Sequence, residues 1–107
     1  MSQNKQAMNK LAQRVISGYE AVHAKDYAKA KQLLEPLIPM LHSETKPNIK
    51  LLSYSAIAQL GTKDVENFLE TCEELKKYEP ANDQEAALVQ RVDDMFVMLM
   101  DTLNEED

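Results

Sequence analysis

Three residues of this chain have side chains that often act as nucleophiles or metal ligands: Cys72, His23 and His42. A cysteine and a histidine that the fold brings together can form a nucleophile–base pair, so this pair is the enzymatic alternative to consider. Cys72, however, lies between Phe68 and Leu75 on an apolar helical stripe, where a free cysteine behaves as a small buried hydrophobe. We therefore expect a structural thiol and no catalytic residue.

The spacing of the ligand-type residues argues against metal chemistry. No two histidines or cysteines lie three or four positions apart, the spacing that places two ligands on one helix face. The acidic pairs Glu73–Glu74 and Asp93–Asp94 are adjacent, so the carboxylates of each pair point in different directions on a helix. Two glycines cannot build a glycine-rich phosphate loop. The sequence therefore predicts no enzyme activity, no metal and no cofactor.

Length and composition predict a single helical domain over residues 1–107. The net charge of −6 argues against nucleic acid or an anionic membrane as a partner. The longest apolar run, Met95–Met100, is too short to span a bilayer, and Met1–Lys10 has no apolar core of a signal peptide. A single cysteine excludes an internal disulfide. We therefore expect a cytoplasmic protein.

The charge is unevenly distributed along the chain. Residues 1–50 carry eight lysines and arginines against four acids, a net charge of +4. Residues 82–107 carry one arginine against eight acids, a net charge of −7. A solvated acidic tail is the simpler interpretation, and recruitment of an acidic partner by the basic first half is the alternative.

Apolar residues recur every three or four positions along almost the whole chain, which predicts about five antiparallel helices and no strand. We expect these helices over residues 4–24, 27–41, 49–60, 63–78 and 82–103. Pro36 and Pro39 predict a kink or a loosened last turn in the second helix, since each removes a backbone donor. Thr62 is a candidate N-cap for the fourth helix, and Asn82 with Glu85 resembles a capping box for the fifth.

An internal repeat joins the first four helices. The series Gly18, Asp26, Ala30, Leu34 and Leu37 recurs 38 residues later as Ala56, Asp64, Phe68, Cys72 and Leu75. The pattern resembles the tetratricopeptide repeat (TPR), a helix–turn–helix unit of about 34 residues. The resemblance covers about residues 11–80. It implies helical pairs over about 4–41 and 48–79, followed by a capping helix over about 82–104.

Two features of this repeat lead to local expectations. In each turn an aspartate, Asp26 or Asp64, can accept hydrogen bonds from the free amides that begin the second helix. Phe68 stands where the family has a small residue, so we expect the second pair either to splay apart or to slip in register.

The TPR resemblance implies a non-enzymatic protein–protein interaction module, an adaptor that binds a peptide or an amphipathic helix. Members of this family bind partners in a concave groove lined by the first helix of each unit. Carried over by position, the groove residues are Ala12, Val15, Ile16, Tyr19, Lys50, Ser53, Tyr54 and Ile57. Lys50 and Arg14 would edge this groove. The alternative is that several of these residues are core and that the last helix fills the groove.

The last helix carries a second candidate surface. Val97 and Met98 fall outside its apolar stripe and Met100 widens the stripe, so we expect these three residues to contact a second copy or a partner. The alternative is that they are scattered apolar residues of an ordinary surface. The alternative functions are therefore an obligate homodimer assembled through the C-terminal helix and, from the resemblance, a small secretion-type chaperone.

Overall fold

The computed structural model describes the backbone of residues 2–105 and the side chains of residues 9–105. Within these residues the chain is all-α and contains no strand, as predicted. The elements in order are α1 (Ser2–His23), α2 (Tyr27–Leu34), the 3-10 segment η1 (Glu35–Leu37), α3 (Ile38–Leu41), α4 (Ile49–Gly61), α5 (Val65–Leu75) and α6 (Asp83–Glu105). Because α2, η1 and α3 together form one interrupted helix, the described residues form five helices.

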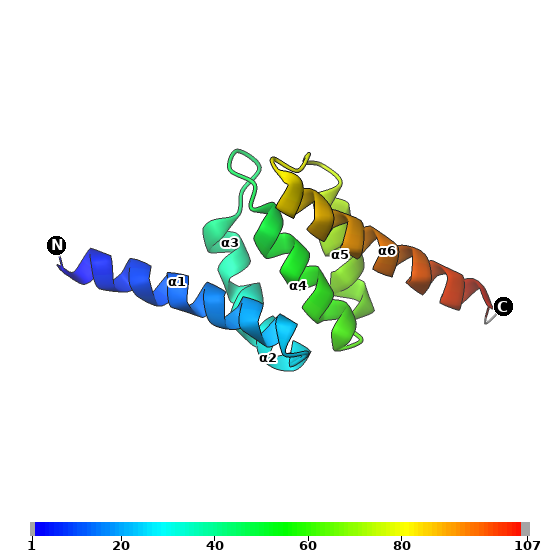
Figure 1. Cartoon of the computed structure of the whole chain (residues 1–107), viewed down its shortest axis with the longest axis horizontal. Helices are drawn as coiled ribbons and strands as arrows, with labels where there is room; N and C mark the ends of the chain where they lie inside the picture. Colours follow the sequence, from blue (N-terminus) through cyan, green and yellow to red (C-terminus); the bar gives the residue numbers. More distant parts are fainter. Residues whose placement is uncertain (1, 106–107) are drawn as a thin grey trace.

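The helix α4 occupies the centre of the molecule (Figure 1). It packs against α1 and α2 on one side and against α5 and α6 on the other. The chain is elongated, with principal extents of 58 × 27 × 22 Å. The beginning of α1 and the end of α6 project at opposite ends (Figure 1). We refer to α1–α2–η1–α3 as the first unit and to α4–α5 as the second.

The turns inside the two units have the same backbone geometry at positions 38 residues apart. Lys25 and Lys63 are left-handed, with φ of 64° and 65°. In each turn the amide of the next residue, Asp26 or Asp64, donates to the carbonyl oxygen five residues earlier at 2.8 Å. This is the Schellman arrangement that ends a helix. The sequence repeat therefore corresponds to a repeated local structure.

The two aspartates of these turns act as predicted. A carboxylate oxygen of Asp26 accepts from the amide of Lys29 at 3.3 Å, and one of Asp64 accepts from the amide of Asn67 at 3.5 Å. The prediction that Thr62 caps α5 is wrong. The Thr62 hydroxyl donates to two carbonyl oxygens in the last turn of α4, so this residue closes α4 instead, and Asp64 caps α5.

The interruption of the second helix follows from its prolines, as predicted. Pro36 has no amide hydrogen to donate to the carbonyl oxygen of Gln32, four residues earlier. Arg14 of α1 supplies the missing donor: its Nη2 donates to Gln32 O at 3.2 Å and its Nε donates to Leu33 O at 3.0 Å. The first unit therefore tolerates its 3-10 segment because the neighbouring helix satisfies the freed carbonyl groups.

Both glycines lie at close contacts between elements. A Cβ at Gly18 would lie 2.4 Å from Cδ2 of the buried Leu34, so α1 and α2 approach each other closely at this glycine. A Cβ at Gly61 would lie 2.4 Å from Cγ of Tyr27, whose ring packs on the end of α4. The first contact holds the first unit together, and the second joins the two units.

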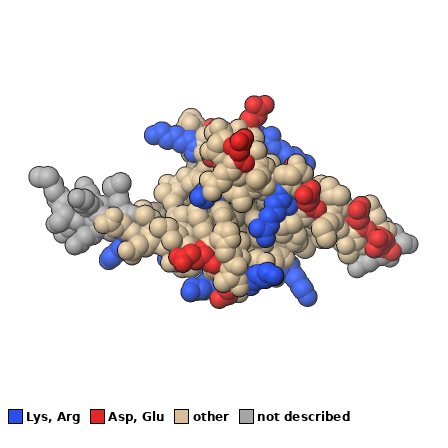
Figure 2. Space-filling view, viewed as in Figure 1, with Lys and Arg blue, Asp and Glu red and all other residues tan. Residues whose placement is uncertain are grey.

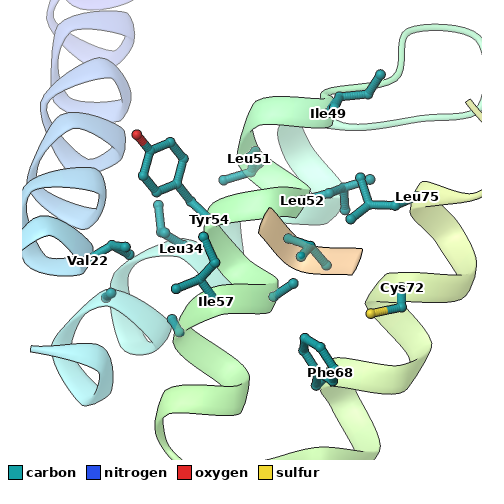
Figure 3. Close-up of a cluster of buried hydrophobic side chains, with 14 of the residues drawn as sticks. Val22, Leu34, Ile49, Leu51, Leu52, Tyr54, Ile57, Phe68, Cys72 and Leu75 are labelled. Carbon is teal, nitrogen blue, oxygen red and sulfur yellow. The ribbon is translucent and has the colours of Figure 1, made fainter. Parts of the chain in front are cut away.

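The second unit keeps its register despite Phe68. This side chain is fully buried and extends from α5 toward α4 (Figure 3). The matching turn geometry excludes a slip at the turn. Asn82 caps the last helix as predicted, because its Oδ1 accepts from the amide of Glu85 at 2.8 Å. The second bond of the predicted capping box is shifted by one residue, since Glu85 Oε1 accepts from the amide of Ala81, the residue before the cap, at 2.8 Å.

Candidate partner-binding site

Two tyrosines join the first helices of the two units. The rings of Tyr19 in α1 and Tyr54 in α4 stack with centroids 4.2 Å apart. The Lys50 ammonium lies 5.3 Å from the centroid of Tyr19, and His23 Nε2 lies 3.0 Å from the Tyr54 hydroxyl. Burial, together with the neighbouring Tyr54, raises the pKa of Tyr19 to about 12, so its hydroxyl stays protonated at neutral pH. The structure thus brings together both halves of the groove predicted from the sequence.

The eight predicted groove residues differ widely in accessibility. Five can be reached by a partner, either exposed or half-buried: Ala12, Val15, Ile16, Tyr19 and Lys50. The other three are at most 6% exposed: Ser53, Tyr54 and Ile57. The accessible part of the predicted groove therefore belongs mainly to α1, and the α4 part is core.

The position of α4 explains this burial. Four helices surround it, and every residue from Leu51 to Gln59 is buried. The sequence contains a signal for this result, because no charged residue occurs between Lys50 and Lys63. A helix without a charged face is buried on all sides.

An apolar hollow borders the accessible residues of α1. It has a volume of about 230 Å³ and is lined by Leu11, Ala12, Val15 and Leu41. Beside it Ile16 is 55% exposed, a large fraction for an isoleucine. Sequence reasoning missed Leu41, because it took groove residues from the first helix of each unit only, whereas Leu41 lies in α3. We call Ala12, Val15, Ile16, Tyr19 and this hollow the α1 face.

The two basic residues predicted to edge the groove have different roles. Lys50 lies at the rim of the α1 face, above the ring of Tyr19. Arg14 donates to backbone carbonyl oxygens of α2 and lies nearly opposite Tyr19 on the helix. Lys50 therefore borders the α1 face, whereas Arg14 holds α1 against α2.

The second predicted surface lies on the projecting part of α6. Val97 is 55% exposed, Met98 is 69% exposed and Met100 is half-buried. Val97 and Met98 point in different directions, since neighbouring residues on a helix are about 100° apart. They therefore belong to two separate sides of α6.

The environment of Cys72 disfavours a nucleophilic thiolate. Cys72 lies in the core beside Leu75 and Phe68 (Figure 3). Burial first, and then the charge of Asp93, raise the pKa of the Cys72 thiol to about 11. His23 hydrogen bonds to Tyr54, and His42 hydrogen bonds to a carboxylate. A thiol in this environment stays protonated at neutral pH.

A polar cluster that sequence reasoning missed connects the two units. The amide of Asn48 donates to His42 Nδ1 at 2.9 Å, so the other ring nitrogen carries the hydrogen. His42 Nε2 then donates to Glu74 Oε2 at 2.9 Å, and the Tyr78 hydroxyl donates to the same oxygen at 2.7 Å. The hydrogen bond from His42 contributes most to lowering the pKa of Glu74 to about 2, and those from Lys77 and Tyr78 contribute further. The cluster links His42, which directly follows α3, to Glu74 in α5.

Among residues 9–105, no group of three or more His, Cys, Asp or Glu side chains is arranged to hold a metal ion. No helix in the described part of the chain has the length and apolar character needed to cross a membrane. Comparisons with family models, curated proteins and solved structures find no match to this chain.

Proposed function

We propose that this chain is a TPR-like protein–protein interaction module that binds an amphipathic helix or an extended apolar peptide on the α1 face. One observation carries the proposal. The stacking of Tyr19 on Tyr54 fixes α1 against α4, and next to this contact an apolar hollow and the exposed Ile16 remain accessible. Accessible apolar residues around a concave site are typical of surfaces that receive a helix.

The repeated unit supports the same proposal. Two helix–turn–helix units with matching turns, followed by a single helix over the second unit, agree with the order of elements in a short TPR array. The buried, protonated thiol of Cys72 favours a binding role over a cysteine-based enzyme. Rapid alkylation of native Cys72 at neutral pH would contradict this part of the proposal.

Binding to the α1 face can be tested with displayed peptides. A library of helical peptides with one apolar face is selected against the whole folded chain, and the dissociation constants of the selected peptides are measured. We expect Ile16→Asp to weaken binding about tenfold or more, because a charge then faces the apolar side of the ligand. Gln32→Asp, an exposed change on α2, is the matched control and leaves binding unchanged.

Two results would overturn the proposal: selected peptides that bind the Ile16→Asp variant as tightly as the original chain, or a selection that yields no binder. Tyr54→Ala is unsuited to this test. Tyr54 is 6% exposed, so its truncation changes the packing of α1 on α4 as well as the surface.

A further inference from the structure

A second hollow opens on the side of the first unit that faces away from α4. It has a volume of about 610 Å³ and lies between α1 and the interrupted second helix. Leu11, Leu33 and Met40 form its apolar part, and Lys10 and Arg14 contribute positive charge to its lining. Met40 is 62% exposed. We call this site the N-terminal hollow.

The N-terminal hollow lies at the end of the helix stack, and no helix in the described part of the chain covers it. Lys10 and Arg14 lie on the face of α1 nearly opposite Tyr19, which contacts α4. The corresponding side of the second unit is covered, because α2 packs against α4. Terminal units of stacked helical repeats normally present a polar outer face. An apolar hollow with an exposed Met40 is the kind of surface that another helix covers.

The end of α6 offers a helix of complementary shape. Val92 in its first half is 1% exposed, but beyond the body of the molecule Met98 is 69% and Leu103 is 44% exposed. Met98, Leu99 and Leu103 fall within an arc of about 140° around α6. Leu99 is half-buried against the core, whereas Met98 and Leu103 are exposed. The end of α6 projects from the rest of the molecule (Figure 1). We call residues 98–105 the α6 end.

The charges of the two sites are also complementary. Asp101 and Glu105 in the α6 end, and Asp94 two turns earlier in α6, recur at helical spacing along the edge beside Met98. Figure 2 shows acidic side chains along this projecting segment. The sequence carries −7 over residues 82–107 and +4 over residues 1–50. The α6 end is therefore an acidic amphipathic helix, and the N-terminal hollow is a basic apolar site.

We propose that a second copy of this chain fills the N-terminal hollow, with the α6 end of one molecule docked head to tail against the first unit of the next. The two sites lie at opposite ends of a molecule 58 Å long, so one chain cannot join them within itself. Pairing of two α6 ends would bring two acidic segments together, which charge repulsion opposes. This contact shares Leu11 with the hollow of the α1 face but otherwise uses the opposite side of α1, so it does not rest on the proposed function.

A head-to-tail contact has a characteristic mass signature. Every molecule keeps one free hollow and one free α6 end, so association continues beyond the dimer unless a ring closes. The average mass therefore rises above 12.2 kDa with protein concentration. It falls again at high salt, because opposite charges at the contact are screened.

The test is sedimentation equilibrium of the whole chain up to about 1 mM, a range that detects weak association. The first variant is Met40→Glu, which places a carboxylate in the apolar lining of the hollow. The second is Met98→Glu, which places a carboxylate on the apolar side of the α6 end. Both residues are exposed, so both variants are expected to fold, and a thermal melt verifies this. Each variant alone is expected to remain a monomer. Val97→Asp, on another side of α6, is the matched control and associates like the original chain.

Mixing the two variants identifies the contact. The Met98→Glu variant keeps an intact hollow, and the Met40→Glu variant keeps an intact α6 end. The α6 end of the second can therefore dock in the hollow of the first, and no further sites remain. An equimolar mixture is expected to form a dimer and nothing larger. A symmetric α6–α6 dimer instead predicts that Met40→Glu still dimerises and that the mixture forms no mixed dimer, and this result would overturn the proposal. A mass of 12.2 kDa for the original chain at every concentration would also overturn it.

Discussion

The two helical units share one turn but differ in how they are packed. In the first unit Gly18 and Ala30 allow α1 and α2 to lie close together, while the outer side of α1 stays accessible. In the second unit Ala56 and Phe68 occupy the equivalent positions, and α4 is buried along its length. The same backbone design therefore produces an accessible helix at the end of the stack and a core helix in its middle.

Position in the stack explains this difference. The turn depends on local groups, namely an aspartate cap and a left-handed lysine, so it repeats wherever they recur. Burial depends on neighbours: α4 has helices on both sides, whereas α1 has neighbours on one side. Substitutions at equivalent positions in the two units test this comparison.

The largest effect is expected at Phe68, whose counterpart in the first unit is Ala30. Phe68→Ala makes the two units alike at this position but leaves a cavity between α4 and α5. We expect a loss of about 3–5 kcal/mol in the free energy of unfolding, measured by urea denaturation. The control is Leu69→Ala, a half-buried neighbour with a smaller expected loss. A loss below about 1 kcal/mol would show that the second unit does not depend on the larger side chain.

Gly18 tests the close contact of the first unit. Gly18→Val places side-chain atoms where Leu34 lies, and an overpacked contact of this kind costs about 1–3 kcal/mol. Urea denaturation measures the loss. Ala12→Val, an exposed change on the same helix, has only a small effect. If both variants were equally stable, α1 and α2 would not need a glycine to approach.

Glu74 tests the junction between the units through pH. Its pKa is lowered from 4.5 to about 2 in the folded chain, so its hydrogen bonds stabilise the fold above pH 4.5. This contribution disappears as the pH falls toward about 2. We therefore expect Glu74→Gln to lower the melting temperature at neutral pH and to reduce its further decrease in acid. Glu73→Gln, at an exposed neighbouring position, is the control and leaves the pH dependence of the melting temperature nearly unchanged. If both variants changed this pH dependence equally, the hydrogen bonds of Glu74 would not stabilise the junction.

The smallest effects are expected in the shared turns. Lys25 and Lys63 adopt a left-handed conformation that glycine adopts at lower cost. Lys25→Gly and Lys63→Gly should each raise the free energy of unfolding by about 0.5–1 kcal/mol and by similar amounts. Lys29→Gly within α2 should lower it by about 1 kcal/mol. Unequal gains would mean that the two turns differ in conformational energy although their hydrogen bonds match.

The sequence by itself determined the helical class, the approximate helix ranges, the interruption at Pro36 and Pro39 and the two aspartate caps. These features depend on periodicity, missing amides and side chains within a few residues of the groups they satisfy. The prediction for Thr62 is wrong because a hydroxyl can either cap the next helix or close the preceding one, and in this turn Asp64 provides the cap.

Only the tertiary structure decided which apolar stripes remain accessible. Tyr54 and Ile57 have the same helical spacing as Ile16 and Tyr19, yet the first pair is buried because α6 and α5 cover α4. The His42–Glu74 contact joins residues 32 positions apart, which no local pattern indicates. A sequence pattern identifies the face of a helix that avoids water. Whether that face meets another helix or remains open depends on how the helices are stacked.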